Sequence, residues 1–251
     1  MPTSRLLLAA LLTILTILTI LITGCFRPRP ATVPMRTVEI KPGAPGSRSL
    51  VVLLPGRYDK PEDFARFGFG ELAEKYGVGA RIVSADAHLG YYLERTVVDR
   101  LREDVIAPAR AQGVERIWLA GVSLGGTGSI LYSIEHPEDV SGITLIAPFL
   151  GEDEVRQEIE AAGGLRGWTP PQTLNPTDFQ RRMWVWLQHP DERIPVYLGW
   201  GTRDRFAAID GLLGAVLPPD RVFTTPGGHA WKPWRALWER FLASGALKGF
   251  S

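Results

Sequence analysis

Short apolar runs bounded by glycine, proline or aspartate alternate with longer segments of helical spacing along most of this 251-residue chain. This alternation constrains the fold more than any other feature, because short apolar runs are typical of strands buried on both faces. We expect strands at Ser49–Leu54, Ala80–Ser84, Arg116–Ala120, Gly142–Ala147, Pro195–Trp200 and Arg221–Thr225, with an edge strand at Thr37–Ile40. We expect helices at Phe64–Tyr76, Leu93–Ala111, Leu124–Glu135, Phe206–Leu217 and Trp231–Ser244. Strand and helix in repetition predict an α/β fold with a mostly parallel sheet and helices on both faces.

The composition supports one globular domain and narrows its partners. A composition of 45% hydrophobic and 22% charged residues is typical of globular proteins and excludes a disordered chain, a collagen or a coiled coil. A chain of this length can bury roughly 70 to 75% of its unfolded surface. The formal net charge of +1 provides no field that would attract nucleic acid. A single cysteine, Cys25, excludes an intramolecular disulfide and a cysteine-rich metal site.

The segment from Phe149 to Asp191 breaks the alternation. Two helices are expected in it, at Asp153–Ala161 and Asp178–Gln188, and an insertion of this length in a sheet fold is usually functional, often a lid. No boundary indicates a second domain, so we expect one domain over residues 37–251 with a helical cap at about 149–191. The cap either provides an apolar roof over a substrate or packs its aromatic residues onto the core; the side chains concerned are Trp168, Met183, Trp184 and Trp186.

The first 24 residues have the organisation of a secretory signal. A basic residue at Arg5 precedes the uncharged run Leu6–Ile22, and the small residues Thr23 and Gly24 follow it. As a helix, that run would extend about 25 Å at 1.5 Å per residue, which is short of a hydrocarbon core of roughly 30 Å. A membrane-spanning helix is therefore the second choice.

The stretch from Ile22 to Cys25 resembles the lipobox of bacterial lipoproteins. That resemblance implies cleavage before Cys25, acylation of its thiol, and an exported protein anchored in a membrane of the cell envelope, on its periplasmic face or at the cell surface. The alternatives are an uncleaved helix or an ordinary signal cut elsewhere. Residues 25–36 contain three prolines and two arginines before Met35, which is typical of a semi-extended tether.

A candidate nucleophile lies in the sequence Gly-Val-Ser-Leu-Gly at residues 121–125. The motif follows an expected strand and begins an expected helix, so Ser123 lies at a sharp strand-to-helix turn. The flanking glycines suit the close approach of strand and helix, and the start of the helix directs free amides towards the reaction centre. The alternative is a glycine-rich turn such as occurs in many parallel-sheet proteins.

A serine hydroxyl needs a base, and the chain has four histidines. His229 follows the last expected strand in a Gly-Gly loop, from which its imidazole can reach over the strand ends towards Ser123. His88, His136 and His189 are better explained as structural or surface residues.

The histidine in turn needs an acid, for which Asp204 is the favoured residue. It comes directly after the expected strand Pro195–Trp200, so its carboxylate should lie at the same sheet edge as Ser123. Asp204 has two other possible roles: it could cap the following helix or pair with Arg203 and Arg205. The competing acids, Asp191, Asp210 and Asp220, are less suitably placed.

From about Thr37 to Ser244 the chain resembles the α/β-hydrolase superfamily. The resemblance depends on the Ser123 motif, on Gly-Thr-Arg-Asp at residues 201–204, on Gly-Gly-His at residues 227–229 and on Leu-Leu-Pro-Gly-Arg at residues 53–57. It implies that the backbone amides of Leu124 and Arg57 form an oxyanion hole. The usual His-Gly pair is replaced here by Pro55 and Gly56, so the loop donor could also be Gly56 or Tyr58.

These residues together predict a serine hydrolase that cleaves a carboxylic ester of a small molecule, or a related amide or thioester, through an acyl-enzyme. No metal or organic cofactor is required. The competing hypothesis is an envelope lipoprotein that keeps the fold but acts as a binding or scaffold protein with an idle triad. Further candidates for lining the substrate pocket are Arg57, Tyr58, His88, Tyr91 and Tyr92.

Overall fold

The computed structural model describes residues 28–189 and 194–250, and one compact unit begins at Ala31. The expected signal segment and Cys25 lie outside the described residues. In the part that is described, no helix combines the length and hydropathy needed to cross a membrane. The folded unit begins before Thr37: the amides of Ala31 and Met35 donate to Glu94 and Asp104, and the Met35 side chain is buried.

The described residues form a seven-stranded sheet of order β1-β3-β2-β4-β5-β6-β7. Only the edge strand β1 is antiparallel to its neighbour, β3, and the other pairs are parallel. This confirms the predicted sheet, including its edge strand, with boundaries that shift by two residues at most. The strands are β1 (Thr37–Lys41), β2 (Ser49–Leu54), β3 (Arg81–Ala85), β4 (Arg116–Val122), β5 (Gly142–Ile146), β6 (Val196–Gly201) and β7 (Val222–Thr225).

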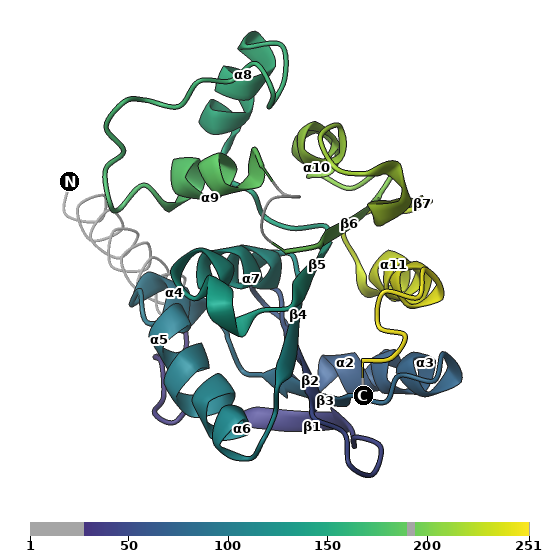
Figure 1. Cartoon of the computed structure of the whole chain (residues 1–251). Helices are drawn as coiled ribbons and strands as arrows, with labels where there is room; N and C mark the ends of the chain where they lie inside the picture. The colour runs from purple at the N-terminus through teal and green to yellow at the C-terminus, as the bar shows by residue number, and fades with distance from the viewer. Residues whose placement is uncertain (1–27, 190–193, 251) are drawn as a thin grey trace, which may run out of the picture. The chain divides into compact units, whose positions relative to one another are not determined.

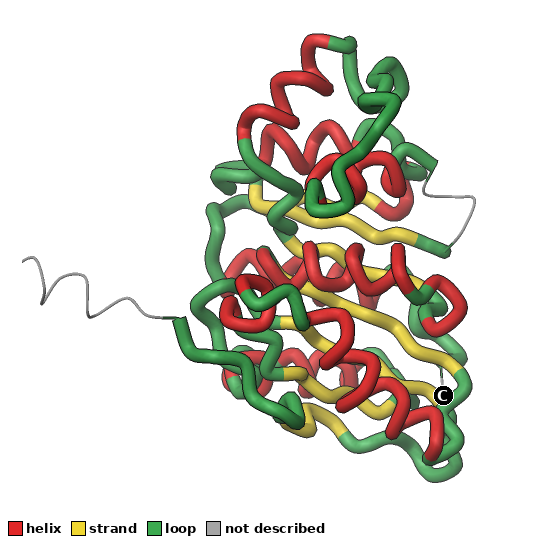
Figure 2. Tube along the Cα trace, turned by 90° about the vertical axis from the view of Figure 1, so that its left-hand side faces the viewer, coloured by secondary structure: helices red, strands yellow, loops and turns green. Residues whose placement is uncertain are grey.

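Helices cover both faces of the sheet (Figures 1 and 2). Residues of β2 alternate between two cores: Val51 and Leu53 pack under α2, α3 and α11, whereas Val52 and Leu54 pack under the helices of the other face. The described α-helices are α2 (Asp63–Arg66), α3 (Phe69–Lys75), α4 (Leu89–Leu93), α5 (Val97–Leu101), α6 (Ala107–Ala111), α7 (Leu124–Glu135), α8 (Asp153–Ala161), α9 (Phe179–Leu187), α10 (Ala207–Gly214) and α11 (Trp231–Ala243).

Two of the helices expected from the sequence are interrupted. The segment Phe64–Tyr76 divides into α2 and α3 because Gly68 adopts a left-handed conformation, with φ of 76°. The segment Leu93–Ala111 is broken at Arg95, where φ is 58°, and continues through α5, one turn of π-helix at Arg102–Ile106, and α6. That turn precedes Pro108, whose ring would clash with a carbonyl in a regular α-helix.

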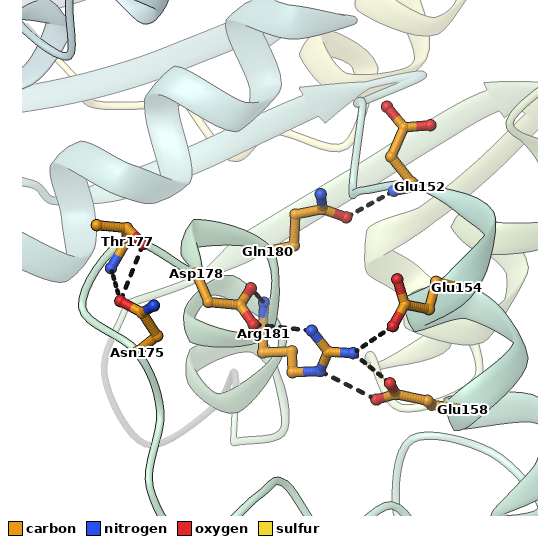
Figure 3. Close-up of polar contacts among 8 residues, drawn as sticks. All are labelled: Glu152, Glu154, Glu158, Asn175, Thr177, Asp178, Gln180 and Arg181. Carbon is orange, nitrogen blue, oxygen red and sulfur yellow. Dashed lines mark hydrogen bonds and ion pairs between the residues drawn. The ribbon is translucent and has the colours of Figure 1, made fainter.

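The insertion between β5 and β6 contains α8 and α9, at the positions predicted for its two helices. Arg181 on α9 holds them together: its guanidinium donates to Glu158 on α8 and to Asp178 at 2.8 Å, and it lies 3.3 Å from Glu154 (Figure 3). Gln180 extends the link by accepting a hydrogen bond from a backbone amide just before α8. The cap is therefore built on polar contacts between its two helices as well as on apolar packing.

Candidate active site

Ser123 lies at the turn between β4 and α7, in a conformation that few L-residues adopt. Its φ is 52° and its ψ is −118°, and the side chain is largely buried. The turn is fixed on both sides: the Ser123 amide donates to the carbonyl of Ile146, and the Ser123 carbonyl accepts from Gly126 and Phe149. Such a strained strand-to-helix turn presents a side chain at the end of the sheet, as the motif predicted.

The glycines around Ser123 leave no room for side chains. A Cβ atom at Gly121 would lie 2.1 Å from the carbonyl oxygen of Gly125, and a Cβ at Gly125 would lie 2.1 Å from the carbonyl oxygen of Leu54. At Gly126 a Cβ would lie 2.6 Å from Pro148. These distances are well inside van der Waals contact, so the turn requires the three glycines.

The side chains of Ser123, His229 and Asp204 form one hydrogen-bonded chain. Nε2 of His229 lies 2.9 Å from Oγ of Ser123, and Nδ1 lies 2.9 Å from each carboxylate oxygen of Asp204. The three residues follow β4, β6 and β7, which are parallel strands, so all come from the same edge of the sheet. The imidazole has a tautomer that connects a donor hydroxyl to an acceptor carboxylate.

Asp204 has a second contact that fits its alternative role. Its Oδ1 also accepts a hydrogen bond from the backbone amide of Phe206, at 2.9 Å, at the start of α10. The carboxylate side chain has no exposed surface, and within the described residues neither Arg203 nor Arg205 forms an ion pair with it. Asp204 therefore both orders its own loop and contacts the imidazole.

Asp210, the competing acid that comes next in the sequence, lies on α10, and its carboxylate forms no hydrogen bond with the imidazole. It is fully buried, and neither of its carboxylate oxygens has a hydrogen-bond partner in the described part of the chain. Burial, together with the charge of Asp204, raises the pKa of Asp210 well above its usual range, which favours the uncharged form. Asp220 is exposed in a turn before β7, and Asp191 lies outside the described residues.

Two aromatic rings hold the imidazole of His229 between them. The Phe206 ring meets it edge to face at 5.0 Å and 82°, and the Trp234 ring does so at 4.9 Å and 85°. Only 13% of the His229 side chain is exposed. The loop after β7 thus presents its histidine from a packed environment, although a Gly-Gly sequence alone would suggest a mobile loop.

The other histidines have local structural roles or positions. Nδ1 of His88 accepts from the amide of Gly90 and caps α4, as the structural interpretation predicted. His136 follows the end of α7 opposite Ser123, and His189 is exposed after α9. His229 is the histidine that the structure brings to Ser123.

The predicted oxyanion donors, the amides of Leu124 and Arg57, lie on either side of Ser123. Leu124 begins α7, where an amide has no partner inside the helix, and no described residue accepts from the amide of Arg57. Gly56 packs next to Ser123, because a Cβ built there would lie 3.3 Å from the Cβ of Ser123. The amide of Tyr58 likewise has no backbone acceptor among the described residues and stays an alternative, whereas the amide of Gly56 interacts with the Asp59 carboxylate.

The cap residues considered for a substrate roof are buried. Trp168, Met183, Trp184 and Trp186 are each at most 5% exposed, and Nε1 of Trp184 donates to the carbonyl of Leu150. They belong to the same hydrophobic cluster as Ile130 of α7, so they pack the cap onto the core. A cavity of about 780 Å³ does open in the cap, lined by Trp168, Asp178 and Arg181 among others, but not by Ser123 or His229.

Of the other pocket candidates, Tyr91 and His88 are also structural. The Tyr91 hydroxyl donates to the carbonyl of Thr32, and the Tyr92 hydroxyl is buried, which raises the pKa of Tyr92. Arg57 and Tyr58 are exposed in the loop after β2, where the guanidinium of Arg57 lies over the Tyr58 ring. These two remain candidates for contacting a substrate.

One group of described side chains has donor atoms close enough to hold a metal ion. It consists of His136, Glu138 and Asp139, at the end of α7 remote from Ser123. Asp139 already accepts from the Tyr132 hydroxyl and pairs with Arg110, and Glu138 is exposed. These contacts explain the group as part of the structure that ends α7.

Three further residues lie around Ser123, His229 and Asp204 in the structure. Phe206 and Trp234 flank the imidazole, and Asp59 lies close enough to His229 for the two charges to interact. No motif marks any of them. The one sequence signal that could have pointed to them is their position after β2, β6 and β7, in or beside the loops expected to carry the site residues.

Comparison with solved structures identifies the fold. S-formylglutathione hydrolase FrmB from Staphylococcus aureus matches with a TM-score of 0.53 and 13% identity, covering 87% of this chain and 98% of that one. Est1E from Butyrivibrio proteoclasticus, with ferulic acid bound, gives 0.52 and 16% over 83% and 94%. Carboxylesterase CesB from Bacillus subtilis gives 0.51 and 14% over 89% and 93%. No family model and no curated protein matches the sequence. The chain has the α/β-hydrolase fold, as predicted.

Proposed function

We propose that the protein is a serine hydrolase that cleaves a carboxylic ester of a small molecule through an acyl-enzyme. The observation that carries this proposal is the hydrogen-bonded chain from Ser123 through His229 to Asp204, with both links at 2.9 Å. A hydroxyl in such a chain can lose its proton to the imidazole as it attacks a carbonyl carbon. The esterases and hydrolase that share the fold support the same class of reaction.

The proposed reaction has two acyl-transfer steps. Nε2 of His229 takes the proton of Ser123 while Oγ attacks the ester, and Asp204 stabilises the resulting imidazolium. The amides of Leu124 and Arg57 hold the oxyanion, and His229 returns the proton to the departing alcohol. Water then attacks the acyl-enzyme in the same way and releases the acid. Every step uses side chains and amides of this chain, so we propose no cofactor.

Labelling with a fluorophosphonate probe tests this proposal. The wild-type protein is expected to become covalently labelled and to lose its hydrolysis of p-nitrophenyl esters, because the probe traps an activated serine. Ser123→Ala should show no labelling above background. Ser129→Ala is the matched control. Ser129 is a buried serine in α7, the helix that begins directly after Ser123, and its hydroxyl donates to the carbonyl of Gly125. Equal labelling of wild type and Ser123→Ala, or none of wild type, would contradict the proposal and favour a binding protein.

We also propose that the protein is exported and anchored in a membrane through acylated Cys25. The support is the sequence alone: a basic start, an uncharged run and small residues directly before the cysteine. Several acyl chains on one residue would give lasting attachment, because each buried methylene contributes about 0.8 kcal/mol.

Mass spectrometry of the mature protein checks the anchor. The N-terminal peptide is expected to begin at Cys25 and to carry a diacylglyceryl-type adduct. Cys25→Ser, which removes the acceptor thiol and changes little else, should leave the membrane fraction. A mature protein that retains residues before Cys25 would show that the anchor is assigned wrongly.

A further inference from the structure

Asp59 links two loops that carry the proposed catalytic groups. It belongs to the β2 loop (Pro55–Lys60), where its amide donates to the carbonyl of Gly56 and closes a turn. Its Oδ1 accepts a hydrogen bond of 2.8 Å from Nε1 of Trp231. Trp231 is the first residue of α11 and comes two residues after His229. One hydrogen bond therefore joins the loop proposed to donate to the oxyanion with the loop that carries the base.

The carboxylate of Asp59 lies close to the nucleophile. A Cβ built on Gly56 would be 2.4 Å from Oδ2 of Asp59 and 3.3 Å from the Cβ of Ser123. Gly56 is thus held between the carboxylate and the serine, with no space for a side chain. A movement of the Asp59 side chain would alter the position of the Gly56–Arg57 backbone, which is where the loop amides of the oxyanion hole are proposed to lie.

The tryptophan partner has a fixed position. The Trp231 ring stacks on Phe67 at 4.7 Å and 7°, and it meets Phe64 and Trp234 edge to face at 5.2 Å. Trp234 in turn contacts the imidazole of His229. The Trp231 side chain is half-buried, and these ring contacts hold its indole N–H where it meets the Asp59 carboxylate of the β2 loop.

The surroundings of Asp59 are those of a half-buried acceptor. Burial raises its pKa above the usual range, and the charge of Asp63 adds to the rise, whereas the bond from Trp231, the charge of His229 and the backbone amide of Gly56 lower the pKa again. The described ionisable groups that face the carboxylate are therefore Asp63 from α2 and His229 from the β7 loop (Pro226–Ala230). The hydrogen bond itself requires an acceptor oxygen and no charge.

We propose that Asp59 is a positioning residue of the esterase reaction, which holds the oxyanion-donor loop in register with the loop of His229 by accepting the Trp231 hydrogen bond. This role rests on the proposed function. Because the oxyanion forms only in the transition state, a misplaced donor lowers kcat and leaves KM nearly unchanged.

Kinetics of matched variants test the role. Asp59→Leu removes the acceptor, and Trp231→Phe removes the donor while keeping an aromatic ring in the stack. Each is expected to lower kcat for p-nitrophenyl acetate by roughly 10- to 100-fold, with KM within about threefold of wild type. Asp59→Asn keeps an acceptor oxygen without the charge and should retain kcat within about threefold. The double variant Asp59→Leu/Trp231→Phe should lose no more than either single one, because both break the same bond.

The controls separate this role from a loss of folding and from the proposed function. Asp220→Leu makes the same substitution at an exposed aspartate in the turn before β7 and should retain wild-type kcat, and thermal melts show whether each variant is folded. A folded Asp59→Leu or Trp231→Phe with full kcat would overturn the positioning role while wild-type labelling at Ser123 still supports the hydrolase. Asp59→Asn as impaired as Asp59→Leu would also overturn it, because charge would then be what matters. A wild-type protein without esterase activity would remove both proposals.

Discussion

Asp204→Asn is expected to lower kcat for ester hydrolysis by about 10⁴-fold while the protein stays folded. An asparagine can keep its oxygen on the Phe206 amide, as Oδ1 does now, and it then turns its NH₂ group towards Nδ1 of His229. The imidazole would be held in the tautomer that carries its proton on Nε2, which cannot accept the proton of Ser123. Steady-state kinetics with p-nitrophenyl esters measure the loss.

Asp210→Asn is the matched control for this variant. Asp210 is a buried aspartate near Asp204, but it has no hydrogen-bond partner among the described residues, and its surroundings already favour an uncharged side chain. An amide of the same shape should keep kcat within about threefold of wild type, because it replaces a side chain that already favours the uncharged form. The reverse pattern, with full turnover in Asp204→Asn and loss in Asp210→Asn, would move the acid role to α10.

Gly125→Ala is expected to destabilise the protein by about 1 to 3 kcal/mol and to abolish turnover. The new methyl group would lie 2.1 Å from the Leu54 carbonyl oxygen and 2.5 Å from its carbon, which are backbone atoms of β2 and cannot turn aside. Relief requires α7 to move away from β2, and this movement would displace Ser123 from His229. Urea unfolding gives the change in stability and esterase assays give the change in turnover.

Gly211→Ala, at a glycine in the middle of a helix, is expected to stabilise the protein and not to destabilise it. In α10 a Cβ at Gly211 meets no atom within 4 Å, so alanine adds helix propensity without a clash. The variant should gain about 0.5 to 1 kcal/mol and keep its activity. A Gly125→Ala protein as stable and active as this control would show that the Ser123 turn tolerates a side chain after all.

The sequence predicted the sheet well because its signals are local. Short apolar runs mark each strand, and the boundaries in the structure differ from the expected ones by at most two residues. The long helices were predicted less well. A break at Gly68 or Arg95 depends on where the chain must turn to reach its next packing surface. The apolar residues keep helical spacing on both sides of the break, so the sequence pattern does not reveal it.

The candidate triad was predictable in part for the same reason. The Ser123 turn is a local motif with strict steric demands, and parallel strands bring the residues after their carboxyl ends to one edge. The sequence favours Asp204 over Asp210, because Asp204 follows β6 directly and Asp210 falls inside the next helix. The hydrogen bonds of Asp204 to His229 and Phe206 distinguish them.

The sequence by itself determined the order of strands and helices and the glycines that the Ser123 turn demands, because neighbouring residues set both. It also determined the sheet edge at which the three polar residues meet. Tertiary structure alone decided that Asp59 meets Trp231, 172 positions away, that two aromatic rings enclose His229, and that the cap tryptophans are buried. Contacts of this kind depend on how distant helices and loops pack together. The packing is fixed by the shapes of many side chains at once, and no single segment of the chain records it.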